Sequence, residues 1–306
     1  MISVSLLQLL AGSLTLYYGA EWLVRGGVHI ARVLRVSPLA IGLTVVAFGT
    51  SLPELFVSVK AALQNSDSIA VGNVLGSNIT NVGLVLGLST LVFPIAISLP
   101  EIFRDLLFYL VISLVLIVFV WDGMISRLEG GLYFTGIILF TVHKFRKPPV
   151  DVEIMPDQLH STWFSLGLIV LGSVLLYFGS DWFIRGAVTI ARILGISEMV
   201  IGMTVVAFGT SLPELATSVV AAFRKEGAIS LGNIIGSNIF NLLSVLGLVS
   251  LIKPLSVPGD IITFEIPVMI GFGLVFLPFS QFRSHVPRWA SAFLVSGYCI
   301  FVYFLF

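Results

Sequence analysis

Two glutamates, Glu54 and Glu214, are the residues of this chain best placed to bind a cation. Each directly follows a proline within the same twelve-residue sequence, TVVAFGTSLPEL, which spans Thr44–Leu55 and recurs at Thr204–Leu215. Both copies lie in long apolar stretches. A lone ionised carboxylate at bilayer depth costs at least ~2.5 kcal/mol. We therefore expect a bound cation or protons to neutralise the two acids.

The residues before Glu54 predict a broken helix that turns oxygen atoms to one side. Thr50 and Glu54 are four positions apart and share a helix face. Pro53 has no N–H, so the carbonyl of Gly49 loses its helical donor. Freed carbonyls, hydroxyls and carboxylates are the ligands that hard cations such as Na⁺ and Ca²⁺ prefer. The candidate ligands of the two motifs are therefore Thr50, Ser51 and Glu54, with Thr210, Ser211 and Glu214.

A purely structural alternative treats the two prolines as kinks and pairs each glutamate with a basic residue. The lysines and arginines of the chain fall near the ends of the apolar stretches. None is expected at the depth of the glutamates, and unpaired acids inside a membrane are rare without a function. We therefore favour an ion-binding site.

A second repeated block, GN-x-x-GSNI-x-N, spans Gly72–Asn81 and Gly232–Asn241. Within each copy the serine and the last asparagine are one helical turn apart and offer neutral oxygens on one face. The G-x-x-x-G spacing favours close helix packing. We expect Ser77, Asn81, Ser237 and Asn241 to be ligands, and Asn73, Asn78, Asn233 and Asn238 to have structural roles.

The elements that carry these motifs are predicted to be membrane-spanning helices. The chain has 306 residues, is 57% hydrophobic and only 10% charged, and its apolar stretches have the length needed to cross a bilayer. We expect an all-α integral membrane protein with ten spans, at about 2–24, 38–63, 69–94, 103–121, 128–143, 161–183, 198–223, 228–253, 261–281 and 287–306.

The polar segment Lys144–His160 divides these spans into two sets of five. Because an odd number of spans forces the second copy into the opposite orientation, we predict two inverted five-helix repeats, residues 1–143 and 161–306, joined by the linker 144–160. One side of the membrane would carry eleven lysines and arginines against five on the other. The more basic side is expected to be cytoplasmic. This predicts a multi-pass cell-membrane protein with a cytoplasmic linker and both termini outside.

Other polar residues are assigned simpler roles. Glu21 and Asp181 each precede an arginine by four residues, the spacing of an intrahelical pair with Arg25 and Arg185. Asp105 and Glu265 also match between the halves, and we expect them at solvated helix ends. The single Cys299 excludes an internal disulfide. The tryptophans are expected in the interfacial belt.

The doubled GTSLPEL and GN-x-x-GSNI-x-N motifs resemble the two alpha repeats of the sodium/calcium exchangers, in the calcium/cation antiporter superfamily. The resemblance covers essentially the whole chain. It implies that Glu54 and Glu214 bind Ca²⁺ and Na⁺ in competition. It assigns supporting oxygens to Thr50, Ser51, Ser77, Asn81, Thr210, Ser211, Ser237 and Asn241, and backbone carbonyls to Ala47 and Ala207.

The resemblance implies a secondary active antiporter that exchanges Na⁺ for Ca²⁺ by alternating access and moves net charge. The expected partners are these ions and the lipid bilayer, with no cofactor and no nucleic acid, and one chain is expected to suffice for transport. Some relatives, including potassium-dependent ones, carry Asp where this chain has Asn241. The neutral side chain weakens the case for K⁺ co-transport.

Three alternatives stay open at the level of sequence. A proton/calcium antiporter would use a pH gradient in place of Na⁺, although that branch usually has a different motif around its acids. A Ca²⁺ channel would need no counter-ion. An enzyme is disfavoured, because no nucleophile and base of the His, Cys or Lys type accompany the two acids.

Overall fold

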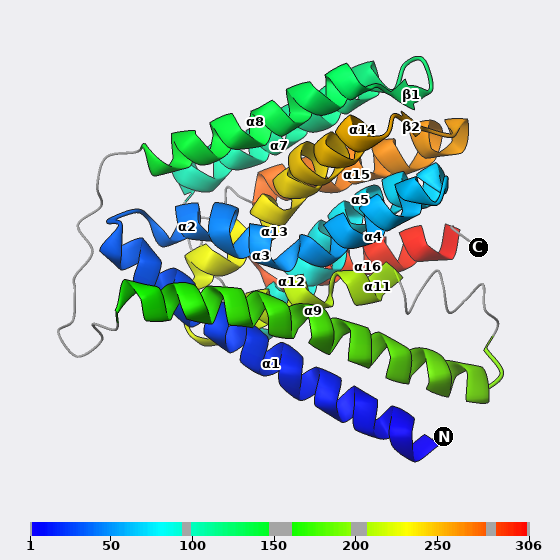
Figure 1. Cartoon of the computed structure of the whole chain (residues 1–306). Helices are drawn as coiled ribbons and strands as arrows, with labels where there is room; N and C mark the ends of the chain where they lie inside the picture. The colour runs from blue at the N-terminus through cyan, green and yellow to red at the C-terminus, as the bar shows by residue number, and fades with distance from the viewer. Residues whose placement is uncertain (1, 94–98, 147–160, 197–206, 280–285, 305–306) are drawn as a thin grey trace.

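The described part of the chain is almost entirely helical (Figure 1). The computed structural model describes residues 2–93, 99–146, 161–196, 207–279 and 286–304. Its elements, in which η denotes a π-helical turn, are α1 (Ile2–Val33), α2 (Pro38–Ile41), η1 (Gly42–Val46), α3 (Ala47–Thr50), α4 (Leu52–Leu63), α5 (Asp67–Thr80), η2 (Asn81–Leu86), α6 (Gly87–Val92), α7 (Leu99–Phe119), β1 (Met124–Ile125), α8 (Arg127–Phe145), α9 (Thr162–Ile193), α11 (Ala207–Thr210), α12 (Leu212–Phe223), α13 (Gly227–Phe240), η5 (Asn241–Leu246), α14 (Gly247–Ile252), β2 (Leu255–Ser256), η6 (Ile261–Glu265), α15 (Ile266–Phe279) and α16 (Arg288–Phe304).

Several of these helices have the length and composition of membrane spans. Six helical stretches of the described residues qualify: Ile2–Val33, Asp67–Val92, Ile102–Phe119, Thr162–Ile193, Gly227–Ile252 and Ile261–Pro278. The pair Pro38–Thr50 and Leu52–Leu63 also qualifies as one bent unit, and two further apolar helices, Leu212–Phe223 and Arg288–Phe304, are shorter. Many large apolar side chains are exposed on this bundle, as expected of a surface that faces lipid.

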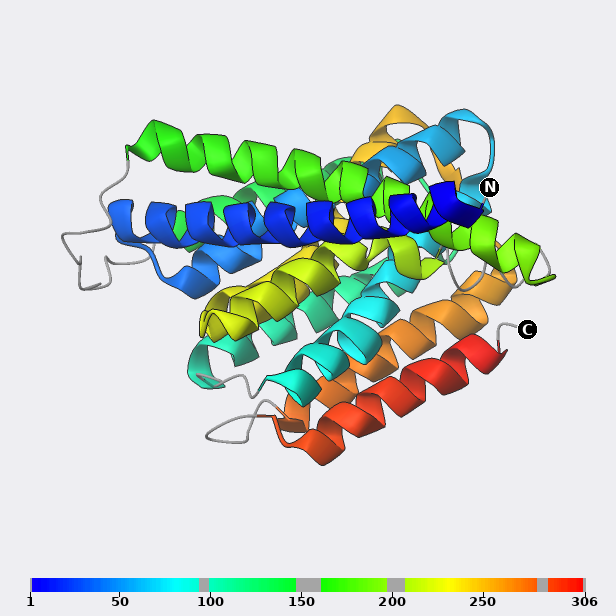
Figure 2. The ribbon, with the colours of Figure 1, turned by 90° about the horizontal axis from the view of Figure 1, so that it is seen from below.

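The two longest helices, α1 and α9, lie side by side and run antiparallel along one side of the bundle (Figures 1 and 2). Glycines recur at intervals of seven on both helices and bring the backbones together. A Cβ added to Gly19 would lie 2.9 Å from the carbonyl oxygen of Gly172, and one added to Gly179 would lie 2.8 Å from the amide nitrogen of Leu16. Only glycine allows so close an approach.

Both long helices exceed the spans predicted for them, 2–24 and 161–183. Each continues by about three turns through the sequence that follows its arginine, to Val33 and Ile193. In α1 this extension keeps one buried face, with Gly27, Ile30 and Ala31 following Leu23. Amphipathic periodicity therefore maintains the helix after the continuous hydropathy has ended.

Both motif copies contain the helix break that the prolines predict. Ser51 separates α3 from α4 with φ −84° and ψ 6°, and Ser211 separates α11 from α12 with φ −87° and ψ 7°. The first pair of helices bends by 45°. Residues 197–206, which include the first three residues of the second copy, lie outside the described residues.

The larger apolar core surrounds α5 and α13, the helices that carry the second repeated block. It includes Leu75 of α5, Leu106 of α7, Ile235 of α13 and Met269 of α15. Strands β1 and β2 pair antiparallel, with Met124 opposite Ser256, and connect the α7–α8 turn to the segment after α14. This packing holds α5 and α13 at the centre of the molecule.

Candidate ion-binding site

The two glutamates occupy equivalent positions in the first turns of α4 and α12. Glu54 and Glu214 are both fully buried. Within the described residues, the ion pairs involve other acids, and neither glutamate has a basic partner. The contacts of the described residues therefore give no support to the alternative of two kinks with salt-bridged glutamates.

Hydroxyl groups connect each glutamate to its surroundings, and the contacts bring the two halves together. Ser51 donates a hydrogen bond to Oε1 of Glu214, with Oγ 3.3 Å away, so a first-half hydroxyl contacts the second-half acid. Ser77 donates to Oε1 of Glu54 at 3.3 Å. Its Oγ also lies 3.5 Å from Oγ1 of Thr210. The two motifs thus form one polar centre from four helices, α4, α5, α11 and α12.

Several buried acceptor oxygens of the two glutamates and of the repeated motifs have no hydrogen-bond donor in the described part of the chain. These buried atoms include Oε2 of Glu54, Oε2 of Glu214, Oδ1 of Asn81, Oδ1 of Asn241 and Oγ of Ser211. A buried polar atom without a partner costs about 1–3 kcal/mol. Carboxylate, amide and hydroxyl oxygens are the kinds of ligand that hard cations such as Ca²⁺ accept in proteins.

Asn81 and Asn241 are held in place by asparagines of the opposite half. Asn81 donates through Nδ2 to Oδ1 of Asn238 at 3.1 Å, and Asn241 donates to Oδ1 of Asn78 at 3.0 Å. The side-chain nitrogens of Asn81 and Asn241 are therefore used in these hydrogen bonds, and their amide oxygens point away from the asparagine partners. Asn81 and Asn241 also begin the π-helical turns η2 and η5. Such turns are rare and occur frequently at functional sites.

Asn73 and Asn233 support the broken helices, in agreement with their predicted structural role. Asn73 donates to the backbone carbonyl of Glu54 at 3.1 Å and to Oγ of Ser58 at 3.0 Å. Asn233 makes a matching bond to Ser218 at 3.1 Å. Ser58 and Ser218 were not singled out from the sequence, although both are serines 160 residues apart and the repeat itself was the available signal.

Two of the predicted neutral ligands of the first half, Thr50 and Ala47, already take part in hydrogen bonds within the protein. Oγ1 of Thr50 donates to Oδ1 of Asn233 at 3.0 Å and lies 3.2 Å from Oγ of Ser237. The carbonyl of Ala47 already accepts from the amide of Ser51 at 3.0 Å and lies 3.2 Å from Oγ1 of Thr50. In the second copy the amide of Ser211 bonds to the carbonyl of Phe208 at 3.1 Å.

Two predicted positions of charged residues are wrong. Glu21 pairs with Arg224 at the end of α12 instead of with Arg25, and Arg224 Nε lies 2.9 Å from its Oε2. Asp105 is not at a solvated helix end, because it is buried and forms an ion pair with Lys144 of α8. In both cases the partner comes from a distant part of the sequence. The predicted Asp181–Arg185 pair is present, with Nε 2.8 Å from Oδ2.

The donor set differs from a metal cluster built of charged side chains. The described residues contain no group of three or more His, Cys, Asp or Glu side chains that could hold a metal ion. A cation at this centre would therefore meet two carboxylates and several neutral oxygens. This composition favours a hard, exchangeable cation over a soft transition metal.

Comparison with known proteins places the whole chain within one family. The model of the family described as sodium/calcium exchanger protein matches residues 4–146 and 164–306. The sodium/calcium exchanger MaX1 of Methanosarcina acetivorans is 34% identical over 100% of this chain and 99% of its own length. The inner membrane protein YrbG of Escherichia coli is 34% identical over 97% of this chain and 95% of its length.

A solved structure of the sodium-calcium exchanger NCX_Mj matches the fold. It aligns with a TM-score of 0.87 and 36% identity, and the match covers 100% of both chains.

Proposed function

This chain belongs to the sodium/calcium exchanger protein family, a family of membrane cation antiporters, and on that premise we propose that it exchanges Na⁺ for Ca²⁺ by alternating access. The observation that carries the proposal is the pair of buried glutamates without basic partners, next to acceptor oxygens that lack donors. Such a centre is stable only when cations or protons neutralise it. Ions that share these oxygens must compete.

We propose that the ligands come from both repeats. Glu54 and Glu214 would supply the charge, and the buried unpaired oxygens of Asn81, Asn241 and Ser211 would supply neutral ligands. The remaining hydroxyl ligands would be Thr50, Ser51, Ser77, Thr210 and Ser237. Ala47 and Ala207 would contribute carbonyls after the hydrogen bonds around the helix break rearrange.

The charge of this centre makes transport electrogenic in the proposal. Two carboxylates neutralise one Ca²⁺ or two Na⁺. A third Na⁺ would be held by neutral oxygens and would add one positive charge to the loaded centre. Each net charge that crosses the membrane couples to about 2.3 kcal/mol per 100 mV. Membrane potential would then drive the exchange.

The proposed architecture is ten spans in two inverted five-helix repeats, in the cell membrane, with the linker cytoplasmic and both termini outside. It is supported by α1 and α9, which are equivalent in the repeat and run antiparallel. It is also supported by the reciprocal contacts of Asn81 with Asn238 and of Asn241 with Asn78. Inverted repeats of this kind build many secondary transporters.

The test is uptake of ⁴⁵Ca²⁺ into proteoliposomes that contain the purified chain and are loaded with Na⁺, K⁺ or acidic buffer. We expect uptake only from Na⁺-loaded vesicles. Exchange of three Na⁺ for one Ca²⁺ moves positive charge outward, so an inside-positive potential should accelerate it. Uptake driven by acidic vesicles in the absence of Na⁺ would identify a proton/calcium antiporter, and equal uptake into every preparation would identify a channel.

A further inference from the structure

Position 241 affects the formal charge of the candidate ion site. An aspartate there would add a third carboxylate to those of Glu54 and Glu214, whereas this chain has an asparagine. Asn241 is fully buried, and its Oδ1 has no hydrogen-bond donor among the described residues. The contacts made by its side-chain nitrogen give a physical reason for an amide at this position.

The side-chain nitrogen of Asn241 donates to an oxygen of the first half. Its Nδ2 lies 3.0 Å from Oδ1 of Asn78, on α5. Both side chains are fully buried, and buried polar groups in proteins are nearly always hydrogen-bonded. An ionised aspartate at position 241 would put a carboxylate oxygen against Oδ1 of Asn78, and neither of these atoms has a hydrogen to donate.

A backbone carbonyl determines which way the amide of Asn78 points. Nδ2 of Asn78 donates to the carbonyl oxygen of Asn238 at 3.2 Å and also lies 3.6 Å from Sδ of Met269. A main-chain oxygen is always an acceptor. If the amide turned over to offer its nitrogen to residue 241, its Oδ1 would face this carbonyl, and two acceptors would meet. The backbone of α13 therefore fixes an acceptor opposite residue 241.

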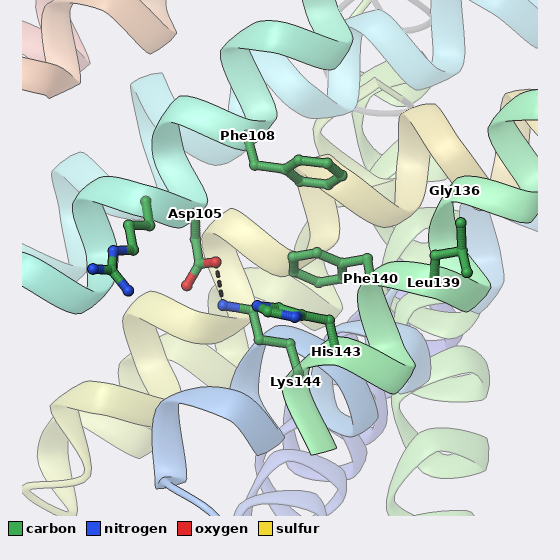
Figure 3. Close-up of a pocket in the computed structure, with 8 residues that line it drawn as sticks. Asp105, Phe108, Gly136, Leu139, Phe140, His143 and Lys144 are labelled. Carbon is green, nitrogen blue, oxygen red and sulfur yellow. Dashed lines mark hydrogen bonds and ion pairs between the residues drawn. The ribbon is translucent and has the colours of Figure 1, made fainter. Parts of the chain in front are cut away.

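A buried carboxylate elsewhere in this protein has different surroundings. Asp105 of α7 lies opposite Lys144 of α8, and the ammonium group donates to the carboxylate, as Figure 3 shows. Both residues are buried. An acid at such a position is stabilised by a charged donor. Residue 241 meets the amide oxygen of Asn78 instead, so its surroundings suit a neutral donor and oppose a carboxylate.

We propose that Asn78 is a positioning residue that requires a neutral amide at position 241 and so limits the ion site to the two charges of its glutamates. The inference rests on the proposed function, because it concerns the cation charge that this site neutralises. Asn78 would also direct Oδ1 of Asn241 toward the ion. Asn81 makes a similar contact, with its Nδ2 3.1 Å from Oδ1 of Asn238, so both asparagines act as donors between the halves.

The test is a double-mutant cycle between positions 78 and 241, measured by thermal unfolding of the ion-free full chain in detergent at pH 8. Asn241→Asp should lower the Tm by roughly 4 °C, because the carboxylate faces an acceptor. In the Asn78→Ser background the same substitution should lower the Tm by no more than about 1 °C. A serine hydroxyl can rotate and donate to the carboxylate.

Transport gives a measurement that a purely space-filling role of Asn78 would leave unchanged. Asn78→Ser removes the acceptor that orients the amide of Asn241. The KM for Ca²⁺, measured from ⁴⁵Ca²⁺ uptake into Na⁺-loaded proteoliposomes, should therefore rise roughly fivefold. The maximal rate should stay within about twofold, because both glutamates are retained.

Ser113→Ala provides the control background. Its hydroxyl donates to the carbonyl of Tyr109 on the same helix, α7, at 2.8 Å. Here Asn241→Asp should lower the Tm as much as in the unmodified chain. If Asn241→Asp yields no folded protein, recovery of folded protein in N78S/N241D supports the proposal, and failure of both variants overturns it.

Two further results would overturn the proposal: equal Tm losses from Asn241→Asp in the unmodified and Asn78→Ser backgrounds, or an unchanged KM for Ca²⁺ in Asn78→Ser. Absence of Na⁺-dependent uptake by the unmodified chain would contradict the proposed function instead. The thermal cycle does not depend on transport, so it would still decide whether Asn78 requires an amide at position 241.

Discussion

The two copies of the glutamate motif share one hydrogen-bonding skeleton. Asn73 donates to the carbonyl of Glu54 at 3.1 Å, and Asn233 donates to the carbonyl of Glu214 at 3.4 Å. In both copies a serine separates the two helices at the break, with nearly identical backbone angles. The repeated sequence therefore produces a repeated local structure around each acid.

The threonines of the two copies differ in the contacts that the described residues give them. Thr50 is fully buried and bonds to Asn233 at 3.0 Å, whereas Thr210 is 7% exposed and lies 3.5 Å from Ser77. The first motif is backed by a close contact with α13, because a Cβ on Gly236 would lie 2.8 Å from Cβ of Ala47. Sequence identity thus supplies the same oxygens twice, and each motif places them against different side chains of the opposite half.

The largest effect is expected when the carboxylate that both copies share is removed. Glu54→Gln and Glu214→Gln should each lower Na⁺-dependent ⁴⁵Ca²⁺ uptake by at least roughly 100-fold, since a bound Ca²⁺ would lack one of its two counter-charges. The two losses should be equal despite the different enclosure. Glu226→Gln, in the turn before α13, is the control and should transport normally. Normal exchange in either test variant would refute the assignment of the acids.

The asparagine pairs should give the next largest effect. Asn81→Ala and Asn241→Ala each remove an amide oxygen and leave an acceptor of Asn238 or Asn78 without its donor, at a cost of about 1–3 kcal/mol. We expect the apparent Ca²⁺ affinity, measured from the concentration dependence of uptake, to fall roughly tenfold. Gln64→Ala, in the exposed turn after α4, should leave it unchanged. An unaltered affinity in both test variants would exclude these amides as ligands.

The serines at the two helix breaks separate structural from ligand roles. Ser51→Ala removes a hydrogen bond to a carboxylate and should destabilise the ion-free protein by about 1–2 kcal/mol. Oγ of Ser211 has no hydrogen-bond partner among the described residues, so Ser211→Ala should change ion-free stability by under about 0.5 kcal/mol. Thermal unfolding with and without Ca²⁺ measures both. If Ser211 is a ligand, its variant should gain less stability from Ca²⁺, and an undiminished gain would remove it from the ligand set.

The smallest effects concern Glu21 and Asp181, which occupy equivalent positions in the two repeats but pair with arginines at different distances along the sequence. Arg224→Gln would leave the nearly buried Glu21 without its partner, and we expect a loss of about 1–2 kcal/mol, reduced by the partial exposure of Arg224. Arg185→Gln breaks an exposed intrahelical pair and should cost about 0.3–0.5 kcal/mol. Thermal unfolding in detergent compares the two variants directly. Equal shifts would show that Glu21 is not stabilised by the long-range contact.

The sequence was sufficient to predict those parts of the site that depend on local spacing. Pro53 and Pro213, two residues after the serines, predicted the breaks. The doubled motif predicted one shared centre, which the contacts of Ser51 with Glu214 and of Ser77 with Thr210 support. Neither inference needed the packing of distant helices. A missing N–H disrupts the helix that contains it, and a repeated sequence predicts that the same local structure occurs twice.

Contacts between different helices could not be predicted in the same way. The pairing of Lys144 with Asp105 depends on how α7 and α8 pack, and hydropathy placed Lys144 in a polar linker. The cross-linked asparagines depend on the relative depth of α5 and α13, which spacing within one helix does not determine. The π-helical turns at Asn81 and Asn241 also have no simple residue signature, since they arise from an extra residue in a helical turn.

The glycine contacts between α1 and α9 have a consequence for the origin of the fold. Gly12 packs against Gly179 and Gly19 against Gly172, and residues 172 and 179 are the repeat equivalents of residues 12 and 19. Either half therefore contains both sides of the contact in a single sequence. Under the proposed inverted-repeat architecture, two separate copies of one half could associate through the same glycines as a symmetric dimer. Gene fusion would then have joined partners whose interface already existed.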